Sequence, residues 1–379
     1  MSVAAAVAWC ALAAAGLPLL MVLVNLGRYR RALPPEAALG QDDRVDVCIP
    51  ARNEAANIEA CVRSVLAQRG ACVRALAYDD QSDDGTGQIL ARLVAEGAAV
   101  AAVATQPLPA GWNGKQWGCE RMGQASDAAW LLFTDADVRL EPDAVAAAVA
   151  FARGSGSDLV STVPLERCGT LGEALLVPLI HFMLLGYLPM GLMRRDARPS
   201  LGAGCGQFLL VRRQAWLRAG GHATFRDSMH DGIRLPRAIR ASGGRTDLFD
   251  GTDLVWCRMY RGLGQCWRGF AKNAYEGLGS PAVLVFFSVL HLLGHVAPWA
   301  VLGAVVMGAP LDAHLVAPAG LAATAGLTTR LLLAIRFRQP LAGALLHPVG
   351  MLLMTAIQWR SLWLARTGRR AWRGRVAGA

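Results

Sequence analysis

The chain has 379 residues, of which 54% are hydrophobic and only 17% are charged. Its mean hydropathy of +0.33 is high for a water-soluble globular protein, so we expect part of the chain to lie in a membrane. The net charge of +10 is not gathered into a long basic run with interleaved aromatic residues, which argues against nucleic acid as a partner. The length is sufficient for two domains.

Cysteine and lysine usage add two observations. None of the nine cysteines forms a C-x-x-C pair, and no spacing is typical of a metal or disulfide framework. We therefore expect a reduced, cytoplasmic catalytic part. Only two of the 38 basic residues are lysines, Lys115 and Lys272. Lys115, which follows Gly114, is explained either by chance or by a need for a compact ammonium instead of the larger guanidinium of arginine.

The N-terminal segment is almost wholly apolar over residues 4–27, and Arg28, Arg30 and Arg31 follow it. This run is longer than the core of a signal peptide, and its positive charge lies on the far side. We expect residues 1–33 to form a transmembrane anchor with its N-terminus outside. A cleaved signal peptide is the alternative.

Between residues 42 and 273, runs with strand character alternate with helical segments. Strands are expected at Arg44 to Ile49, Val73 to Tyr78, Val100 to Ala104 and in the run ending at Thr134, and helices over Glu54 to Gln68, Asp84 to Glu96, after Lys115, and over Pro142 to Phe151. This alternation predicts an α/β domain with a parallel-rich sheet and right-handed crossovers.

One expected strand ends in two carboxylates. Asp135 and Asp137 follow the apolar run Leu131–Thr134, and side chains two apart on an extended backbone point the same way. A carboxylate pair without nearby His or Cys suits Mg²⁺ or Mn²⁺, completed by water and substrate phosphate oxygens, better than Zn²⁺. A solvated loop with two acids is the alternative.

Two other strand ends carry polar residues. Asn53 can cap the helix that follows it, with Glu54 in the first turn, and Ser82 or Asp83 can cap the next helix. Asp80 is then left in the crevice at the carboxyl ends of the strands, where ligands bind in open α/β sheets. A carboxylate there can accept hydrogen bonds from a base or a ribose.

Four motifs occur in order along this region: Val47–Glu54 (VCIPARNE), Asp79–Thr86 (DDQSDDGT), Gly114–Lys115 and Thr134–Asp137 (TDAD). Together they resemble the family 2 glycosyltransferases, nucleotide-sugar enzymes of the GT-A fold, over roughly residues 44–272. The segment Trp112–Trp117 (WNGKQW) more closely resembles the branch that acts on lipid acceptors, such as carotenoid and ceramide glucosyltransferases.

This resemblance implies roles for particular residues. The nucleotide would be bound by Pro50, Arg52, Glu54, Asp79, Asp80 and Lys115, and the metal on the donor diphosphate would be held by Asp135 and Asp137. It also implies a UDP-sugar as the donor.

His230–Asp231 opens an expected helix over Gly232 to Ala241 and resembles the Glu-Asp of the family, whose Asp is the base. Inverting transfer needs a carboxylate to take the proton from an acceptor hydroxyl as it attacks C1. Asp231 is therefore the candidate base, although His230 stands where the family usually has Glu. A helix-start residue without chemistry is the alternative.

The acceptor side of the family has a glycine-rich turn similar to Gly204–Cys205–Gly206, where we expect Cys205 to pack rather than act as a nucleophile. Gln265–Gly269 resembles the Gln-x-x-Arg-Trp of processive synthases, but Gly269 replaces the Trp. This difference argues against polymer synthesis. Arg268 remains a candidate diphosphate partner, and Trp267 a candidate acceptor platform.

Ala174 to Met193 is largely apolar and is interrupted by Pro178 and Pro189. A true span here would separate the two halves of the active site across the membrane, so we expect an interfacial or re-entrant segment. A lipid acceptor could enter there. An ordinary buried helix is the alternative.

Further apolar runs occupy about 282–309, 315–335 and 341–364 of the C-terminal region 281–379. Three spans would leave the basic tail outside, against the positive-inside tendency, so a break at Pro298 or at His347–Pro348 is expected.

Together with the family resemblance, these features predict a multi-pass enzyme of the inner membrane with a cytoplasmic GT-A domain. It would transfer a hexose, with inversion, from a UDP-hexose to a lipid acceptor and would use Mg²⁺ or Mn²⁺. A polyprenyl-phosphate sugar synthase is the close alternative. A non-catalytic nucleotide-binding membrane partner is the alternative from another class.

Overall fold

The computed structural model describes residues 3–372 and 375–376. The chain forms two compact units, each built from separate stretches of sequence. The first unit contains residues 1–28, 167–190 and 260–367, and the second contains residues 29–166, 191–259 and 368–379. We predict three consecutive regions, at residues 1–33, 42–273 and 281–379. Each compact unit, in contrast, combines stretches from several parts of the chain.

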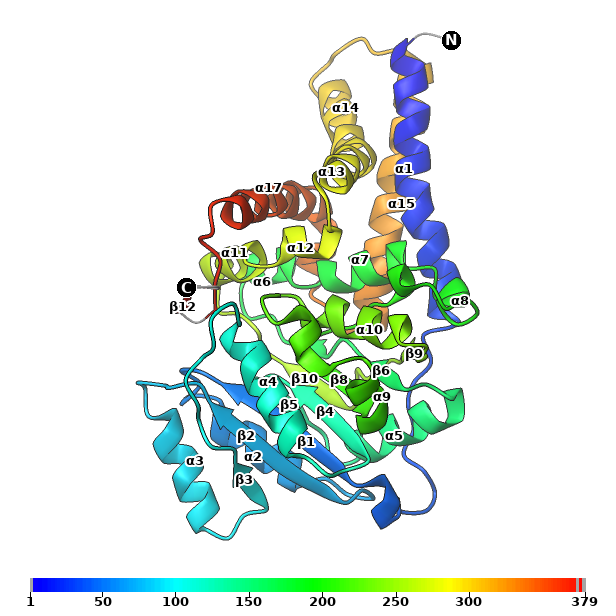
Figure 1. The fold of residues 1–379 in the computed structure, drawn as a ribbon. Helices are drawn as coiled ribbons and strands as arrows, with labels where there is room; N and C mark the ends of the chain where they lie inside the picture. The colour runs from blue at the N-terminus through cyan, green and yellow to red at the C-terminus, as the bar shows by residue number, and fades with distance from the viewer. Residues whose placement is uncertain (1–2, 373–374, 377–379) are drawn as a thin grey trace. The chain divides into compact units, whose positions relative to one another are not determined.

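A seven-stranded sheet forms the centre of the second unit (Figure 1). In spatial order its strands are β3 (Val100–Ala102), β2 (Val73–Asp79), β1 (Val45–Ala51), β4 (Trp130–Thr134), β8 (Phe208–Arg212), β6 (Leu159–Ser161) and β9 (Thr246–Leu248). Only β8 runs against its neighbours, pairing antiparallel with β4 and β6. The sheet is therefore parallel-rich, as predicted, and mixed.

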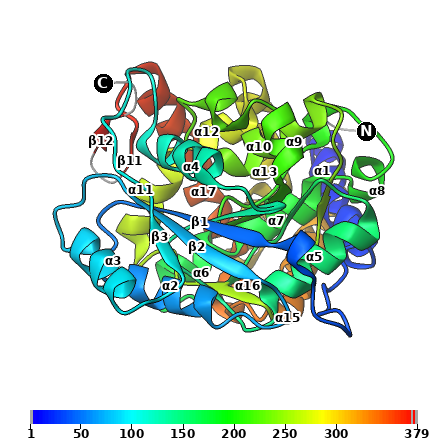
Figure 2. The ribbon, with the colours of Figure 1, turned by 60° about the horizontal axis from the view of Figure 1, so that its bottom comes forward.

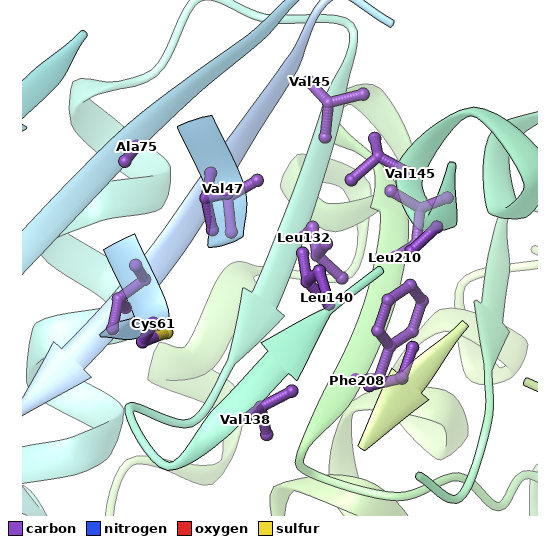
Figure 3. Close-up of a cluster of buried hydrophobic side chains, with 14 of the residues drawn as sticks. Val45, Val47, Cys61, Ala75, Leu132, Val138, Leu140, Val145, Phe208 and Leu210 are labelled. Carbon is purple, nitrogen blue, oxygen red and sulfur yellow. The ribbon is translucent and has the colours of Figure 1, made fainter. Parts of the chain in front are cut away.

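Successive side chains of a strand point to opposite faces of the sheet, and apolar residues occupy both faces here. Val45, Val47 and Ile49 of β1 belong to one buried cluster, and Cys48 belongs to another. Helices α2 (Ile58–Leu66), α3 (Thr86–Ala95) and α5 (Ala144–Ser155) contribute to the first cluster, part of which Figure 3 shows. Helices α4 (Gly114–Ala125), α9 (Arg213–Arg218) and α10 (Asp231–Ala241) contribute to the second.

The helices of the first face begin a few residues later than predicted, at Ile58, Thr86 and Ala144. Figure 2 shows α2 and α3 beside the strands β1, β2 and β3, and α2 contacts β2 while α3 contacts β3. Short 3₁₀ segments lie at Gln41–Asp43, Pro199–Leu201 and Gly221–Phe225.

A smaller sheet in the same unit contains β5 (Val138–Leu140), β10 (Val255–Cys257) and β7 (Leu165–Glu166). β10 pairs antiparallel with β5 and parallel with β7. This pairing places Cys257 opposite Val138, directly after the Asp135–Asp137 pair. The chain ends with two short antiparallel strands, β11 (Ala371–Trp372) and β12 (Arg375–Val376).

The first unit is helical. Its helices are α1 (Val3–Leu26), α6 (Leu171–Leu176), α7 (Leu179–Tyr187), α11 (Leu263–Ala271), α12 (Ala274–Leu278), α13 (Pro281–His295), α14 (Ala297–Val306), α15 (Ala313–Arg336), α16 (Leu341–Leu345) and α17 (His347–Arg366). The short helix α8 (Met190–Met193) follows α7. Small residues allow close helix packing here: Ala15 of α1 clusters with Ala322 and Ala325 of α15.

Within residues 3–372 and 375–376, three segments are long and apolar enough to cross a membrane: Val3–Leu26, Pro281–Val306 and Ala313–Arg336. Helix boundaries lie at both candidate positions, because α13 ends at His295 before Pro298 and a new helix starts at His347. α13 and α14 together still form one of the three candidate segments, so the number of spans stays a prediction. The apolar stretch that we expect to be interfacial is divided into α6, α7 and α8 around Pro178 and Pro189.

Candidate active site

The loops after β1 and β2 are joined to each other by hydrogen bonds. The Asn53 amide nitrogen donates to Ser82 Oγ at 3.0 Å, and the Asp83 amide nitrogen donates to Asn53 Oδ1 at 3.0 Å. Asn53 has a φ of 53°, which asparagine tolerates better than most residues. The predicted helix caps are therefore wrong, because Asn53 and Ser82 bond across the two loops, and α2 and α3 begin only at Ile58 and Thr86.

Glu54 belongs to the same network. Its amide nitrogen donates to Thr86 Oγ1 at 2.9 Å, and the Ala55 amide nitrogen donates to Asp84 Oδ2 at 2.9 Å. The Glu54 carboxylate accepts a hydrogen bond from Asn57 Nδ2 at 2.9 Å. Glu54 is therefore a fixed, nearly buried acceptor at the carboxyl end of β1.

Asp79 and the first turn of α3 pack closely together. Asp79 Oδ1 accepts hydrogen bonds from the Ser82 amide nitrogen at 3.1 Å and from the Ser82 hydroxyl. A Cβ on Gly87 would lie only 2.8 Å from Asp79 Oδ2. The carboxylate is thus held in place by the loop that follows it.

Asp80 directly follows β2, at the carboxyl ends of the strands, and it is only 1% exposed. Its role as an acceptor for a base or a ribose stays a prediction. Arg52 Nη1 lies 3.5 Å from Asp80 Oδ2 and also donates to the Asp80 carbonyl oxygen. A Cβ on Gly114 would overlap Asp80 Oδ2, so α4 begins against this carboxylate. A negative charge is favourable at a helix N-terminus, which explains the burial. Pro50 is buried as well.

Asp135 and Asp137 lie in the turn that joins β4 to β5. β4 ends at Thr134, and the Val138 amide nitrogen donates to the Asp135 carbonyl oxygen at 3.1 Å. The argument from an extended backbone is therefore wrong for this pair, because the chain turns between the two residues. Both side chains remain partly exposed.

Helix α4 is tied to the loop that precedes Asp231. Asn113 caps the helix, since its Oδ1 accepts from the Lys115 amide nitrogen at 2.9 Å. One turn further, Gln116 Nε2 donates to the Ser228 carbonyl oxygen at 3.1 Å. These bonds bring together two segments that are more than one hundred residues apart in sequence.

The Lys115 ammonium lies between two carboxylates. Its Nζ is 2.6 Å from Asp135 Oδ1 and 2.8 Å from Asp231 Oδ2. Burial alone would lower the pKa of Lys115, but the two carboxylates raise it well above its ordinary value. Burial raises the pKa of Asp231, yet the Lys115 ammonium brings it below its ordinary value. Lys115 and Asp231 are thus charged, and the candidate base and the candidate metal ligand contact the same ammonium.

The glycine-rich turn makes room for Asp231. A Cβ on Gly206 would overlap Asp231 Oδ1, and a Cβ on Gly232 would lie 2.7 Å from the Gly204 carbonyl oxygen. Asp231 Oδ1 accepts from the Gly232 amide nitrogen at 2.9 Å. Burial raises the pKa of the Cys205 thiol, as expected of a packing residue rather than a nucleophile.

Three residues that the sequence analysis does not identify lie around the turn that contains Asp135 and Asp137. Burial, followed by the charge of Asp137, raises the pKa of Glu166 well above its ordinary value. Gln207 Nε2 donates to Cys257 Sγ at 3.1 Å, and the Gln207 carbonyl oxygen accepts from Thr134 Oγ1 at 2.8 Å. Glu166 and Cys257 reach this place through the pairing of β7 with β10, for which the sequence carries no local signal.

The donor set fits a hard divalent cation that the protein holds only in part. Asp135 and Asp137 offer partly exposed carboxylate oxygens, the ligands that Mg²⁺ and Mn²⁺ prefer, and Glu166 is buried beside Asp137. Within the described residues, however, no group of three or more His, Cys, Asp or Glu side chains is placed to hold a metal ion. Water and the donor diphosphate would have to complete the coordination.

Gln265, Trp267 and Arg268 lie on α11, which belongs to the first unit. Gln265 Oε1 accepts from the Arg261 amide nitrogen at 2.9 Å. A Cβ on Gly269 would overlap the Tyr260 ring, which explains why no larger residue stands there. The acceptor and diphosphate roles of these residues stay predictions.

Comparison with known proteins agrees with this arrangement. Residues 46–217 match the family model described as Glycosyl transferase family 2. A curated relative, 4,4'-diaponeurosporenoate glycosyltransferase of Staphylococcus haemolyticus, is 25% identical over 255 residues; the match covers 66% of each chain, about two thirds of the relative's length.

Among solved structures, the mannosyltransferase PcManGT from Pyrobaculum calidifontis, in complex with GDP-Man and Mn²⁺, is similar with a TM-score of 0.58 and 20% identity. The match covers 95% of this chain and 99% of that chain, and it shows a shared fold. Residues 46–217 therefore carry a Glycosyl transferase family 2 domain, and the chain shares its fold with the solved mannosyltransferase.

Proposed function

We propose that this chain is a membrane-bound glycosyltransferase that transfers a hexose, with inversion, from a nucleotide diphosphate sugar to a lipid acceptor. One observation carries the proposal. Asp231, the candidate base, and Asp135, a candidate metal ligand, lie within 2.8 Å of the same ammonium. A base and a metal site for the leaving diphosphate must be adjacent in a displacement at one carbon.

In the proposed reaction, the Asp231 carboxylate takes the proton of the acceptor hydroxyl. The acceptor oxygen forms a bond to C1 of the sugar, and the bond from C1 to the diphosphate oxygen breaks on the opposite side. The nucleoside diphosphate leaves with that electron pair. A bound divalent cation would neutralise the charge that develops on the diphosphate, and Asp135 and Asp137 would hold it.

The nucleotide would be bound by the joined loops after β1 and β2. Pro50, Arg52, Glu54, Asp79 and Asp80 all lie in or beside this network. Because Pro50 and Asp80 are buried, we propose that they shape the site, while more exposed groups contact the nucleotide. UDP-hexose is the proposed donor, and GDP-mannose is the donor to compare with it, since PcManGT was solved with GDP-Man and Mn²⁺.

A lipid acceptor is supported by two findings. Three segments of the described chain could cross a membrane, and the name of the curated relative indicates transfer to diaponeurosporenoate, a carotenoid-type acceptor. We propose that the catalytic unit is cytoplasmic in an inner membrane and that the apolar stretch from α6 to α8 is interfacial. A polyprenyl phosphate is the other lipid to test.

The test is the release of nucleoside diphosphate from UDP- and GDP-hexoses by the membrane-embedded chain, with Mn²⁺ or Mg²⁺ and total lipid extract. Asp231→Asn should lower lipid-dependent turnover by about 10²–10⁴-fold, the usual contribution of a general base. Asp137→Ala should lose the metal-dependent turnover, and EDTA should stop the native enzyme. Asp143→Asn, an exposed residue paired with Arg69, is the matched control.

Mass spectrometry of the labelled lipid would then identify the acceptor. A carboxylate or phosphate acceptor is already ionised, so Asp231→Asn should cost less with it than with a hydroxyl acceptor. Metal-dependent turnover that needs no lipid, or full activity of Asp231→Asn with a hydroxyl acceptor, would contradict the proposal.

A further inference from the structure

The inference concerns Lys115 and rests on the proposed assignment of the metal to Asp135 and Asp137. The Lys115 ammonium makes two ion pairs, at 2.6 Å to Asp135 and 2.8 Å to Asp231. Its side chain is 15% exposed, that of Asp231 is 9% exposed and that of Asp135 is 33% exposed, so water screens the contact with Asp231 weakly and the contact with Asp135 only in part. One side chain therefore neutralises a candidate metal ligand and the candidate base together.

The position of this ammonium is fixed by the backbone. Lys115 is the second residue of α4, whose first turn is capped by Asn113 and packs against Asp80 through Gly114. On the other side, a Cβ on Gly206 would overlap Asp231, so that carboxylate has little room to withdraw. The backbone therefore holds this ion-pair cluster in place, and the cluster does not depend on flexible side chains at the surface.

A divalent cation at Asp135 would meet a positive charge 2.6 Å from its ligand oxygen. Like charges so close together in a site that water screens only in part repel each other. The described residues also include no group of three or more metal-binding side chains that could hold the ion without help. The ion therefore needs an additional source of negative charge, and the donor diphosphate supplies it.

We propose that Lys115 is an internal cation that occupies the metal position in the donor-free protein, so that metal binds only together with the nucleotide diphosphate. When metal and nucleotide bind, the ammonium leaves Asp135 for the diphosphate, and Asp231 loses a partner and becomes available as a base. Lys115 is in this sense a positioning residue for both groups, and it enforces the order of binding.

The experiment measures Mn²⁺ binding by the full chain in detergent, from the electron paramagnetic resonance signal of free Mn²⁺, without nucleotide and with UDP or GDP. The native protein should bind Mn²⁺ weakly until nucleotide is added. Lys115→Met removes the charge and should bind Mn²⁺ alone at least about tenfold more tightly, with a correspondingly smaller effect of nucleotide. Lys272→Met changes the other lysine of the chain and is the matched control.

Two further variants keep the test decisive. Lys115→Arg retains the charge and should exclude Mn²⁺ as the native residue does, whereas Lys115→Gln should behave like Lys115→Met if the latter fails to fold. Equal affinity of the native and neutral variants for Mn²⁺ alone, with only nucleotide binding weakened, would overturn the proposal, because Lys115 would then be a phosphate ligand and nothing more.

Further results distinguish a failure of the proposed function from a failure of the proposed role of Lys115. If Asp135→Asn and Asp137→Ala do not weaken the Mn²⁺ binding of Lys115→Met, the metal assignment itself is wrong. If Mn²⁺ behaves as expected but no donor turns over, the internal-cation role stands and the transfer reaction does not.

Discussion

At the scale of single residues, the site depends on glycines that let carboxylates approach the backbone. Gly114 and Gly206 each face a carboxylate oxygen so closely that any side chain would overlap it. The two oxygens belong to Asp80 and Asp231, a predicted nucleotide residue and the candidate base. Neither glycine has a positive φ, so space rather than backbone conformation explains them.

Gly206→Ala is expected to displace Asp231 and to lower turnover by about 100-fold, as a misplacement of about 1 Å near a reacting group can do. The added methyl group should also destabilise the fold by roughly 1–3 kcal/mol through overpacking. Turnover and thermal unfolding of the same preparation check both effects. Gly154→Ala is the matched control, because a Cβ there meets nothing within 4 Å. Unchanged turnover in Gly206→Ala would contradict this role.

His222 is a buried neutral histidine. Trp216 Nε1 donates to His222 Nδ1 at 3.0 Å, and the His222 amide nitrogen donates to Glu120 Oε2 at 2.8 Å. Burial lowers the pKa of His222 to about 3, from an ordinary value near 6.5. The ring therefore stays neutral in the folded protein where the unfolded chain takes up a proton.

Because the pKa of His222 is lower in the folded state, its contribution to stability is complete above pH 6.5 and is lost as the pH falls toward 3. Between about pH 6 and pH 4, the free energy of unfolding of the native chain should fall more steeply than that of His222→Gln. The difference should approach 1.4 kcal/mol per pH unit, equivalent to one proton. Denaturant titrations at several pH values measure it, and parallel slopes would contradict it.

At the scale of elements, side-chain contacts join β1 and β2 in addition to the backbone hydrogen bonds between these strands. Asp46 of β1 is fully buried and accepts from Arg74 Nε at 3.0 Å and Arg74 Nη2 at 2.6 Å. Ser126 Oγ, after α4, donates to the same carboxylate at 2.6 Å. One carboxylate thus joins two strands and the end of a helix, at the opposite end of β1 from the site.

Asp46→Ala is expected to destabilise the fold by roughly 2–4 kcal/mol, because it removes one partner of a buried pair and leaves Ser126 without its acceptor. Asp143→Ala removes an exposed ion pair with Arg69 and should cost less than about 1 kcal/mol. Denaturation of both variants in the same detergent provides the comparison. Equal losses would show that burial of Asp46 has no special effect.

At the scale of the whole molecule, the chain passes five times between two units. Residues 167–190 leave the α/β unit between β7 and the glycine-rich turn, and they contribute α6 and α7 to the helical unit. Asn25 of α1 fixes the end of α7, since its Nδ2 donates to the carbonyl oxygens of Leu185 at 2.8 Å and Leu188 at 2.7 Å. The helical unit is therefore one packed structure and not a set of independent anchors.

We expect the full chain to remain in the membrane pellet after an alkaline carbonate wash and to be released only by detergent, because its three candidate spans expose apolar side chains such as Leu20, Phe286 and Leu321. Fractionation and immunoblotting measure this. Release by carbonate would show that the helical unit lies on the membrane surface.

The sequence alone determined the features that depend on local spacing and composition. The alternation of strands and helices, the apolar segments, the breaks at Pro178, Pro298 and Pro348, and the motif of Asp135 and Asp137 all follow from neighbouring residues. They could be predicted because backbone periodicity and helix breaking act over a few residues.

The tertiary structure alone decided the features that join distant residues. It reversed β8 within the sheet, buried Asp80 against the start of α4, and bonded Asn53 to the next loop instead of to its own helix. It also placed Lys115 between Asp135 and Asp231. No local pattern encodes these contacts, because each depends on how strands and helices far apart in the chain pack around one core.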